Sequence, residues 1–156
     1  MFIREEVVSK IREWLKAENW KLSEFRDANF QLAYKIVLSN GREIYLGLEK
    51  SVDRLTIQNT LLIPPDIKNI YRLSPNKYKF LNEIKVHLMQ MEVSTEIYPS
   101  FEELESINIS NFIYFDGFSR NKLIHGIYKL ADATDLVFIM WKKFTESHLH
   151  SDQQKY

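Results

Sequence analysis

Three residue types used in nucleophilic catalysis, a carboxylate, a serine and a histidine, occur close together as Asp116, Ser119 and His125. A serine activated by a histidine would be a nucleophile for acyl transfer. A nucleophile elbow needs the pattern Gly-x-Ser-x-Gly, however, and Asn121 stands at its final position. His125 lies nearly two helical turns beyond Ser119, which is too far for a direct proton transfer. We therefore interpret Asp116-Gly117 as a turn and Ser119 as a helix N-cap.

A small enzyme or ligand-binding domain is the alternative to this interpretation. Its cleft would be lined by Tyr114, Asp116 and His125, and the hypothesis requires these side chains to converge in one concave pocket. Because a turn and a cap account for the local pattern, we assign no catalytic and no cofactor-binding residue. We expect that the protein is not an enzyme.

A second cluster of ligating groups lies near the C-terminus and consists of Glu146, His148, His150 and Asp152. Imidazoles two residues apart with flanking carboxylates could bind zinc or nickel if an extended backbone aimed them together. The sequence that follows, SDQQKY, is typical of a polar, frayed terminus. We therefore predict one domain over residues 1–146 and a frayed tail over residues 147–156, and we assign no metal ligand.

Composition argues against several further classes of protein. The chain has no cysteine, which excludes thiol catalysis, disulfides and iron–sulfur ligation. Its four glycines form neither a phosphate-binding loop nor a dinucleotide fingerprint. No run approaches the ~20 apolar residues of a membrane span, and Glu5 and Glu6 interrupt the apolar start. We expect a cytoplasmic protein that does not associate with membranes.

Charge is balanced over the whole chain but uneven along it. The 21 basic and 21 acidic residues give no global field that would favour nucleic acid. Residues 86–119 contain no Lys or Arg, whereas residues 66–85 carry five basic and two acidic residues. We expect these opposite charges to meet or to face water. The competing hypotheses are a charged docking surface and nucleic-acid binding through the basic segment 68–85.

Hydrophobic periodicity predicts a single α+β domain in which helices pack on an antiparallel meander, in the order α-ββββ-α-ββ-α. Apolar residues at helical spacing predict three main helices, over about residues 3–18, 78–91 and 119–144. Alternation predicts strands near residues 20–25, 30–38, 44–48, 55–63, 93–98 and 109–115. Two short helices are also expected, at residues 66–71 and after Ser100, where Ser100 and Glu103 match a capping box. Ser74 followed by Pro75 predicts the N-cap of the middle helix.

The first hairpin has a register that its sequence specifies. A two-residue Asn-Gly turn would set the apolar face of one strand against the polar face of the other. A three-residue loop with Gly41 in the left-handed conformation instead pairs Ile36 with Ile44 and Tyr34 with Leu46, so both apolar faces coincide. We therefore predict the three-residue loop.

The outward row of the meander is neither fully polar nor fully apolar. It contains Val37, Tyr45 and Leu62 among charged residues, and the last strand, with Phe112 and Tyr114, is apolar on both faces. A second copy of the chain is the simplest cover for such a surface, because most soluble oligomers are symmetric homodimers. We predict an interaction surface at these five residues.

The order of elements and the ending FDGFSRNKLIHGIYKLADATDLVFIMW resemble archaeal members of an uncharacterised family with the type III secretion chaperone-like fold. The resemblance implies an α+β domain that often dimerises and binds protein segments, and it transfers no catalytic residue. The balanced charge of this chain differs from the acidic character usual in secretion chaperones. The resulting prediction is a non-enzymatic interaction domain, chaperone-like or adaptor, that binds itself and another protein.

Overall fold

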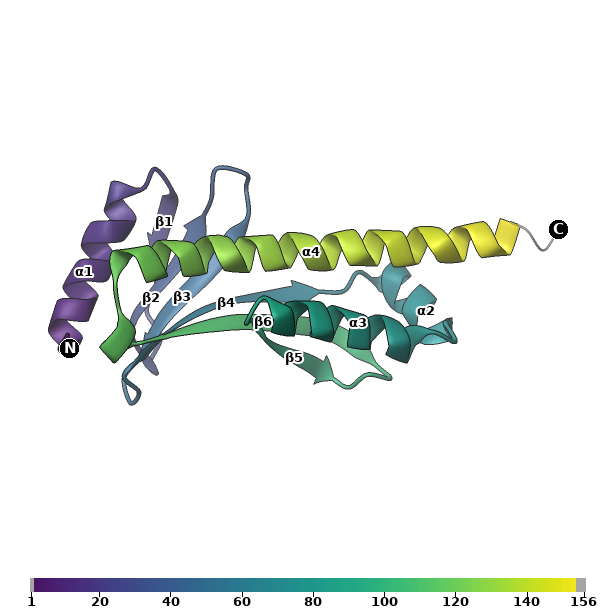
Figure 1. Ribbon diagram of the computed structural model, residues 1–156, viewed down its shortest axis with the longest axis horizontal. Helices are drawn as coiled ribbons and strands as arrows, with labels where there is room; N and C mark the ends of the chain where they lie inside the picture. The colour runs from purple at the N-terminus through teal and green to yellow at the C-terminus, as the bar shows by residue number, and fades with distance from the viewer. Residues whose placement is uncertain (1, 154–156) are drawn as a thin grey trace. The chain divides into compact units, whose positions relative to one another are not determined.

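The computed structural model describes the backbone of residues 2–153 and the side chains of residues 2–149. Its elements follow the order predicted from the sequence, and α2 is the short helix expected at residues 66–71 (Figure 1). They are α1 (Arg4–Ala17), β1 (Lys21–Glu24), β2 (Phe30–Val37), β3 (Glu43–Glu49), β4 (Arg54–Leu62), α2 (Pro65–Leu73), α3 (Lys77–Gln90), β5 (Ser94–Pro99), β6 (Leu104–Tyr114), the 3-10 turn η1 (Phe115–Gly117) and α4 (Arg120–Gln153).

The strands form one six-stranded sheet in the order β1-β2-β3-β4-β6-β5. Its first four strands pair antiparallel in sequence order, as expected of a meander. The predicted α+β class is therefore confirmed.

The β2–β3 hairpin has the register that its hydrophobic pattern specifies. Ile36 lies opposite Ile44 and Tyr34 opposite Leu46. The amide of Leu38 donates to the carbonyl of Arg42, and Gly41 has a φ of 84°, a conformation that L residues rarely adopt. The predicted three-residue loop is confirmed.

Contacts along the chain group into two compact units. Unit 1 comprises residues 1–59 and 110–131, and unit 2 comprises residues 60–109 and 132–156. The single domain expected over residues 1–146 stays a prediction.

In unit 1, both helical segments cover the same face of the sheet. The buried side chains of α1 lie against this face. Arg12 of α1 forms an ion pair with Glu24 of β1, and Glu24 lies opposite the buried Tyr34 of β2. The first turns of α4 pack on the same side. Gly126 shows how close this contact is, since a Cβ added there would lie 3.0 Å from the side chain of Ile57. We call this covered side the inner face and the opposite side the outward face. Alternation along the strands then decides which side chains lie on each.

In unit 2, aromatic residues of α2, α3 and α4 form one part of the core. Trp141 packs edge-on against Phe80 at a centroid distance of 4.8 Å and contacts Tyr71 at 5.7 Å. The hydroxyl of Tyr71 donates to the carbonyl of Phe101. Burial raises the pKa of Tyr71 to about 12, and the carboxylate of Glu102 acts in the same direction.

Helix α3 ends in a Schellman motif. The amide of Val93 donates to the carbonyl of Leu88, and the amide of Glu92 donates to that of Met89. Glu92 has a φ of 59°, so a non-glycine residue occupies the left-handed position of this motif. Leu88 and Val93 are both buried, which supplies the apolar contact that usually accompanies the motif.

Three local predictions are wrong. Helix α4 continues through Gln153, so residues 147–153 of the predicted frayed tail are helical, whereas residues 154–156 lie outside the described residues; near this end His148 contacts Phe144 and Ser74. Helix α3 begins at Lys77, because Ser74 instead accepts a hydrogen bond from the amide of Asn76 in the turn between α2 and α3.

The third error concerns the capping box at Ser100. Its hydroxyl does accept a hydrogen bond from the amide of Glu103, as predicted. No helix follows, because residues 101–103 form a bend that leads directly into β6. A serine hydroxyl that stabilises a local turn gives the same sequence signal as a helix cap.

Among the helices of the described chain, none combines the length and apolar character required to cross a membrane.

Candidate functional site

Most residues of the predicted interaction surface lie on the outward face of unit 1. Val37 and Tyr45 are half-buried on this face, next to polar partners on the neighbouring strands. Val37 lies opposite Glu43, and Tyr45 lies between Lys35 and Gln58. The ring of Tyr45 makes an edge contact with Phe25, with 6.4 Å between the ring centroids, so the apolar area extends toward β1.

Phe112 and Tyr114 extend this face onto β6. The guanidinium carbon of Arg54 lies 4.3 Å from the centroid of the half-buried Phe112 ring, within the range of a cation–π contact. The side chain of Tyr114 is 55% exposed. Arg54 Nε and Thr56 Oγ1 are buried without a hydrogen-bond partner among the described residues. Buried polar atoms without a hydrogen-bond partner are uncommon in folded proteins, so these two atoms are an unusual feature of this face.

Of the five residues predicted to form an interaction surface, four therefore lie in unit 1. We call Val37, Tyr45, Phe112 and Tyr114 the outward patch. The fifth, Leu62, is 75% exposed but belongs to unit 2, so it is not grouped with them. Sequence reasoning missed Phe25 and Arg54, which join the face through contacts across strands that periodicity alone does not specify.

The alternative cleft at Tyr114, Asp116 and His125 does not form. All three side chains are exposed, and no hydrogen bond joins them in the part of the chain with described side chains. Tyr114 is on the outward face, whereas α4, which carries His125, packs on the inner face. Ser119 acts as the predicted cap, since its hydroxyl accepts a hydrogen bond from the amide of Lys122.

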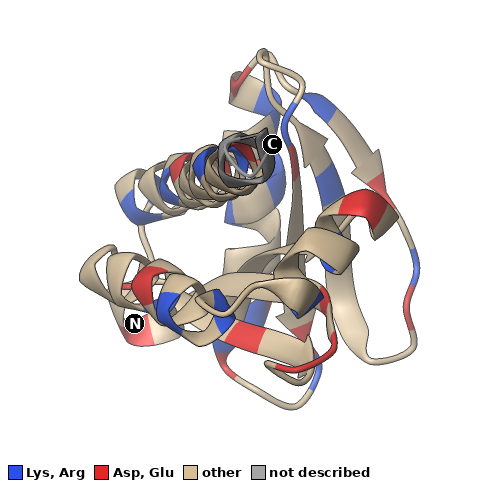
Figure 2. Cartoon of the chain, turned by 90° about the vertical axis from the view of Figure 1, so that its right-hand side faces the viewer, with Lys and Arg blue, Asp and Glu red and all other residues tan. Residues whose placement is uncertain are grey.

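The basic segment 68–85 meets the acidic residues that follow it. Lys68 binds Glu105 at 2.7 Å, and Lys77 binds Glu102 at 2.9 Å. Figure 2 marks the basic residues in blue and the acidic residues in red, and both signs are spread over the ribbon. The expectation that the two oppositely charged segments meet is confirmed at these two pairs. Each pair reduces the positive charge that the segment could offer to nucleic acid.

No group of three or more metal-ligating side chains occurs within residues 2–149. His150 and Asp152, which belong to the cluster noted in the sequence, lie outside the described side chains. His148 lies inside them, and its ring nitrogens have other partners: Nδ1 is 2.8 Å from the carbonyl of Phe144, and Nε2 is 2.7 Å from Ser74 Oγ.

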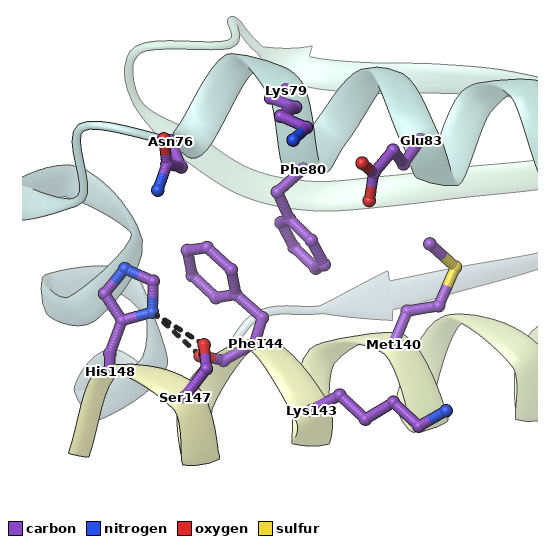
Figure 3. Close-up of a pocket in the computed structure, with 9 residues that line it drawn as sticks. All are labelled: Asn76, Lys79, Phe80, Glu83, Met140, Lys143, Phe144, Ser147 and His148. Atoms are coloured by element: carbon purple, nitrogen blue, oxygen red, sulfur yellow. Dashed lines mark hydrogen bonds between the residues drawn. The ribbon is translucent and has the colours of Figure 1, made fainter. Parts of the chain in front are cut away.

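A groove of about 320 Å³ lies in unit 2 between α3 and α4 (Figure 3). The stacked rings of Phe80 and Phe144, with centroids 4.1 Å apart, project into it from the two helices. Met140 adds a thioether from α4. Helical periodicity did not single out Phe80, yet both phenylalanines are largely buried. Because the two residues are far apart in the chain, no sequence pattern indicates that their exposed edges line one groove.

Polar groups surround this aromatic floor. On and just before α3 they are Lys79, Glu83 and the N-cap residue Asn76. On α4 they are Lys143, Ser147 and His148, and the ring of His148 lies 4.3 Å from that of Phe144. The groove thus combines an apolar floor with a small number of polar groups, as is typical of ligand sites.

Comparison with known proteins identifies relatives of unknown function. A family model described as "Uncharacterized conserved protein (DUF2299)" matches residues 7–141. The crystal structure of an uncharacterised protein from Methanothermobacter thermautotrophicus aligns with a TM-score of 0.79 and 23% identity, covering 88% of this chain and 97% of that one. The similarity shows a shared fold, and it confirms the predicted resemblance to an uncharacterised archaeal family.

A weaker similarity is to YbjN of E. coli, described as a putative transcription regulator, with a TM-score of 0.49 and 10% identity over 92% of this chain and 93% of that one. No curated protein matches the chain.

Proposed function

The chain belongs to the DUF2299 family of uncharacterised conserved proteins, and we propose that it is a non-enzymatic protein-interaction domain that forms a homodimer through its outward patch. The patch would pair with the same patch of a second copy. Binding of a further protein, as a chaperone or adaptor would require, extends the same proposal.

The proposal rests on one observation: in unit 1, helices cover only one face of the sheet. Both helical segments of the unit pack on the inner face, where side chains such as Ile36 and Ile57 are fully buried. The outward patch keeps apolar area in contact with solvent, including most of the Tyr114 side chain. Apolar area exposed in this way is stabilised when a partner covers it, by roughly 25 cal/mol for each Å² removed from water.

The charges on this face favour a second copy over a strongly charged partner. Lys35 and Glu43 form an ion pair at 3.1 Å on the outward face, and Glu49 and Arg54 add one charge of each sign. A two-fold interface brings the same patch together twice, so a patch that carries both signs can match itself. The zero formal net charge of the chain also gives no long-range repulsion between copies.

Sedimentation equilibrium over a range of protein concentrations tests the proposal. We expect a reversible monomer–dimer equilibrium, and we expect Tyr114→Arg to weaken it by about 10-fold or more because two unpaired cations would face each other across the interface. Tyr98→Arg is the matched control, since Tyr98 is also a strongly exposed tyrosine on a strand but lies in unit 2.

Two results would overturn the proposal. A monomer at millimolar concentration would exclude the homodimer. A dimer that both arginine variants weaken equally would place the interface elsewhere.

A further inference from the structure

We propose that the groove between α3 and α4 binds a small amphipathic monoanion, with an apolar or aromatic body on the phenylalanine floor and its carboxylate or sulfonate group between Lys79 and Lys143. This site lies entirely in unit 2 and does not depend on the dimer proposed above.

The floor of the groove fits a flat apolar body. Phe80 and Phe144 stack at 4.1 Å with an interplanar angle of 17°, so they present neighbouring ring edges to the groove (Figure 3). Both residues are about nine-tenths buried, which holds the rings in place before a ligand arrives. Met140 lines the same groove and has an unbranched side chain that adapts to ligands of different shape. The volume of about 320 Å³ is near the lower limit for small-molecule pockets.

The lysines of the groove are available for an anion. Lys79 and Lys143 are both exposed, and neither forms an ion pair among the described residues. They differ in this respect from Lys68 and Lys77, two basic residues of the same unit that are already bound to glutamates. Charge complementarity therefore favours a ligand with a negative group.

The start of α3 adds positive potential on the same side. The first turn of this helix contains no acidic residue, and the N-cap Asn76 makes no hydrogen bond from its side chain to the helix. Unsatisfied amides and the helix dipole attract negative charge at such an end. Asn76 and Lys79 both line the groove, so this potential acts close to the lysines.

Glu83 limits the charge of the ligand. Its exposed carboxylate lines the groove one helical turn after Lys79, so two lysines and one glutamate leave a single net positive charge. A ligand with one negative charge balances that set, whereas a dianion such as a phosphate monoester would be repelled by Glu83. We therefore assign the site to a monoanion.

Two fluorescent probes with the same aromatic body separate the apolar and ionic contributions. One is 1-anilinonaphthalene-8-sulfonate, a monoanion, and the other is N-phenyl-1-naphthylamine, which lacks the sulfonate. We expect saturable binding of the sulfonate, weakened about 2- to 5-fold by Lys143→Gln and similarly by Lys79→Gln, the range expected for an exposed ion pair. Lys142→Gln is the matched control, because Lys142 is exposed on the same helix but does not line the groove. Binding of the neutral probe should be the same in all three variants.

Methyl NMR shows whether the probe occupies this groove. The chain has four methionines, and Met140 lines the groove while Met89 is strongly exposed elsewhere on unit 2. In protein labelled with ¹³C-methyl methionine, the Met140→Leu variant assigns the Met140 methyl resonance. The sulfonate probe should shift this resonance and leave that of Met89 unchanged.

Each outcome decides for or against the proposal. A saturable Met140 shift together with selective weakening by Lys79→Gln and Lys143→Gln supports it. Unsaturable binding, an unmoved Met140 methyl, or equal effects of Lys142→Gln and Lys143→Gln would overturn it. So would equal loss of the neutral probe in the lysine variants, because the ionic contact would then be absent.

Discussion

The ring of Phe30 occupies the space where Gly47 would carry a side chain: a Cβ on Gly47 would lie 2.7 Å from the ring. The two residues are on neighbouring strands β2 and β3, on the outward face of unit 1. We predict that Gly47→Ala lowers the free energy of unfolding by about 1–3 kcal/mol, because the half-buried ring must leave its position. Urea denaturation of the two proteins measures this loss.

Removing the ring tests that cause. In a Phe30→Ala background, Gly47→Ala should cost little, so the double-mutant cycle should give a clear coupling energy. Additive losses would mean that the added methyl group acts through the strand backbone and not through Phe30.

The second prediction concerns the end of α3. Glu92 has a φ of 59°, which costs an L residue about 1–2 kcal/mol and a glycine almost nothing. We therefore expect Glu92→Gly to raise the free energy of unfolding by up to about 1 kcal/mol, measured by urea denaturation. Met91→Gly is the control, because Met91 precedes Glu92 with a right-handed helical backbone and should lose stability on the same change. A loss in both variants would contradict the prediction.

The third prediction is a dependence of stability on alkaline pH. Burial raises the pKa of Tyr71 to about 12, above the ordinary value of 10.0, so the unfolded chain releases this proton at lower pH than the folded chain. The contribution of the neutral phenol is therefore fully present below pH 10 and is lost as the pH rises toward 12. We expect the free energy of unfolding to fall across this window.

Tyr71→Phe isolates this residue from the other groups that titrate at high pH. The variant should be less stable at pH 7 by about 1–2 kcal/mol, because the carbonyl of Phe101 loses its donor. Its stability should then fall less steeply between pH 10 and pH 12 than that of the parent protein. Parallel curves for the two proteins would show that Tyr71 does not carry the pH dependence.

Local chemistry allowed much of the fold to be predicted from the sequence. In the first hairpin, the pattern of alternation and the position of Gly41 together permit only one register that buries both apolar faces, and that register is observed. The element order was also predictable, because helical and strand periodicities differ.

The remaining errors arise where one signal has two structural meanings. Ser100 and Ser74 each accept a hydrogen bond from a nearby amide, and both do so in turns where the sequence predicted helix caps. The tail was predicted as frayed because its residues are polar, but contacts of His148 with Phe144 and Ser74 support helix there.

The candidate ligand groove could not be predicted for a different reason. Its floor consists of two phenylalanines from α3 and α4, and each lies among the buried residues of its own helix. Periodicity indicates which face of a helix is apolar, but it does not specify which ring edges stay accessible after packing. Whether Lys79 forms an ion pair depends on where acidic residues of other elements lie after folding, so it could not be predicted from the sequence either.

The last prediction compares the two ion pairs that join the basic and acidic segments of unit 2. Lys77 binds Glu102, and its side chain is 16% exposed, whereas Lys68, which binds Glu105, is 33% exposed. Because the lysine of the second pair is the more exposed of the two, we expect double-mutant cycles with Lys→Met and Glu→Gln to give about 1 kcal/mol for the Lys77 pair and less than about 0.5 kcal/mol for the Lys68 pair. As salt is added, the coupling energy of the Lys68 pair should fall at a lower salt concentration than that of the Lys77 pair. Equal coupling energies in urea denaturation would show that side-chain burial does not set the strength of these pairs.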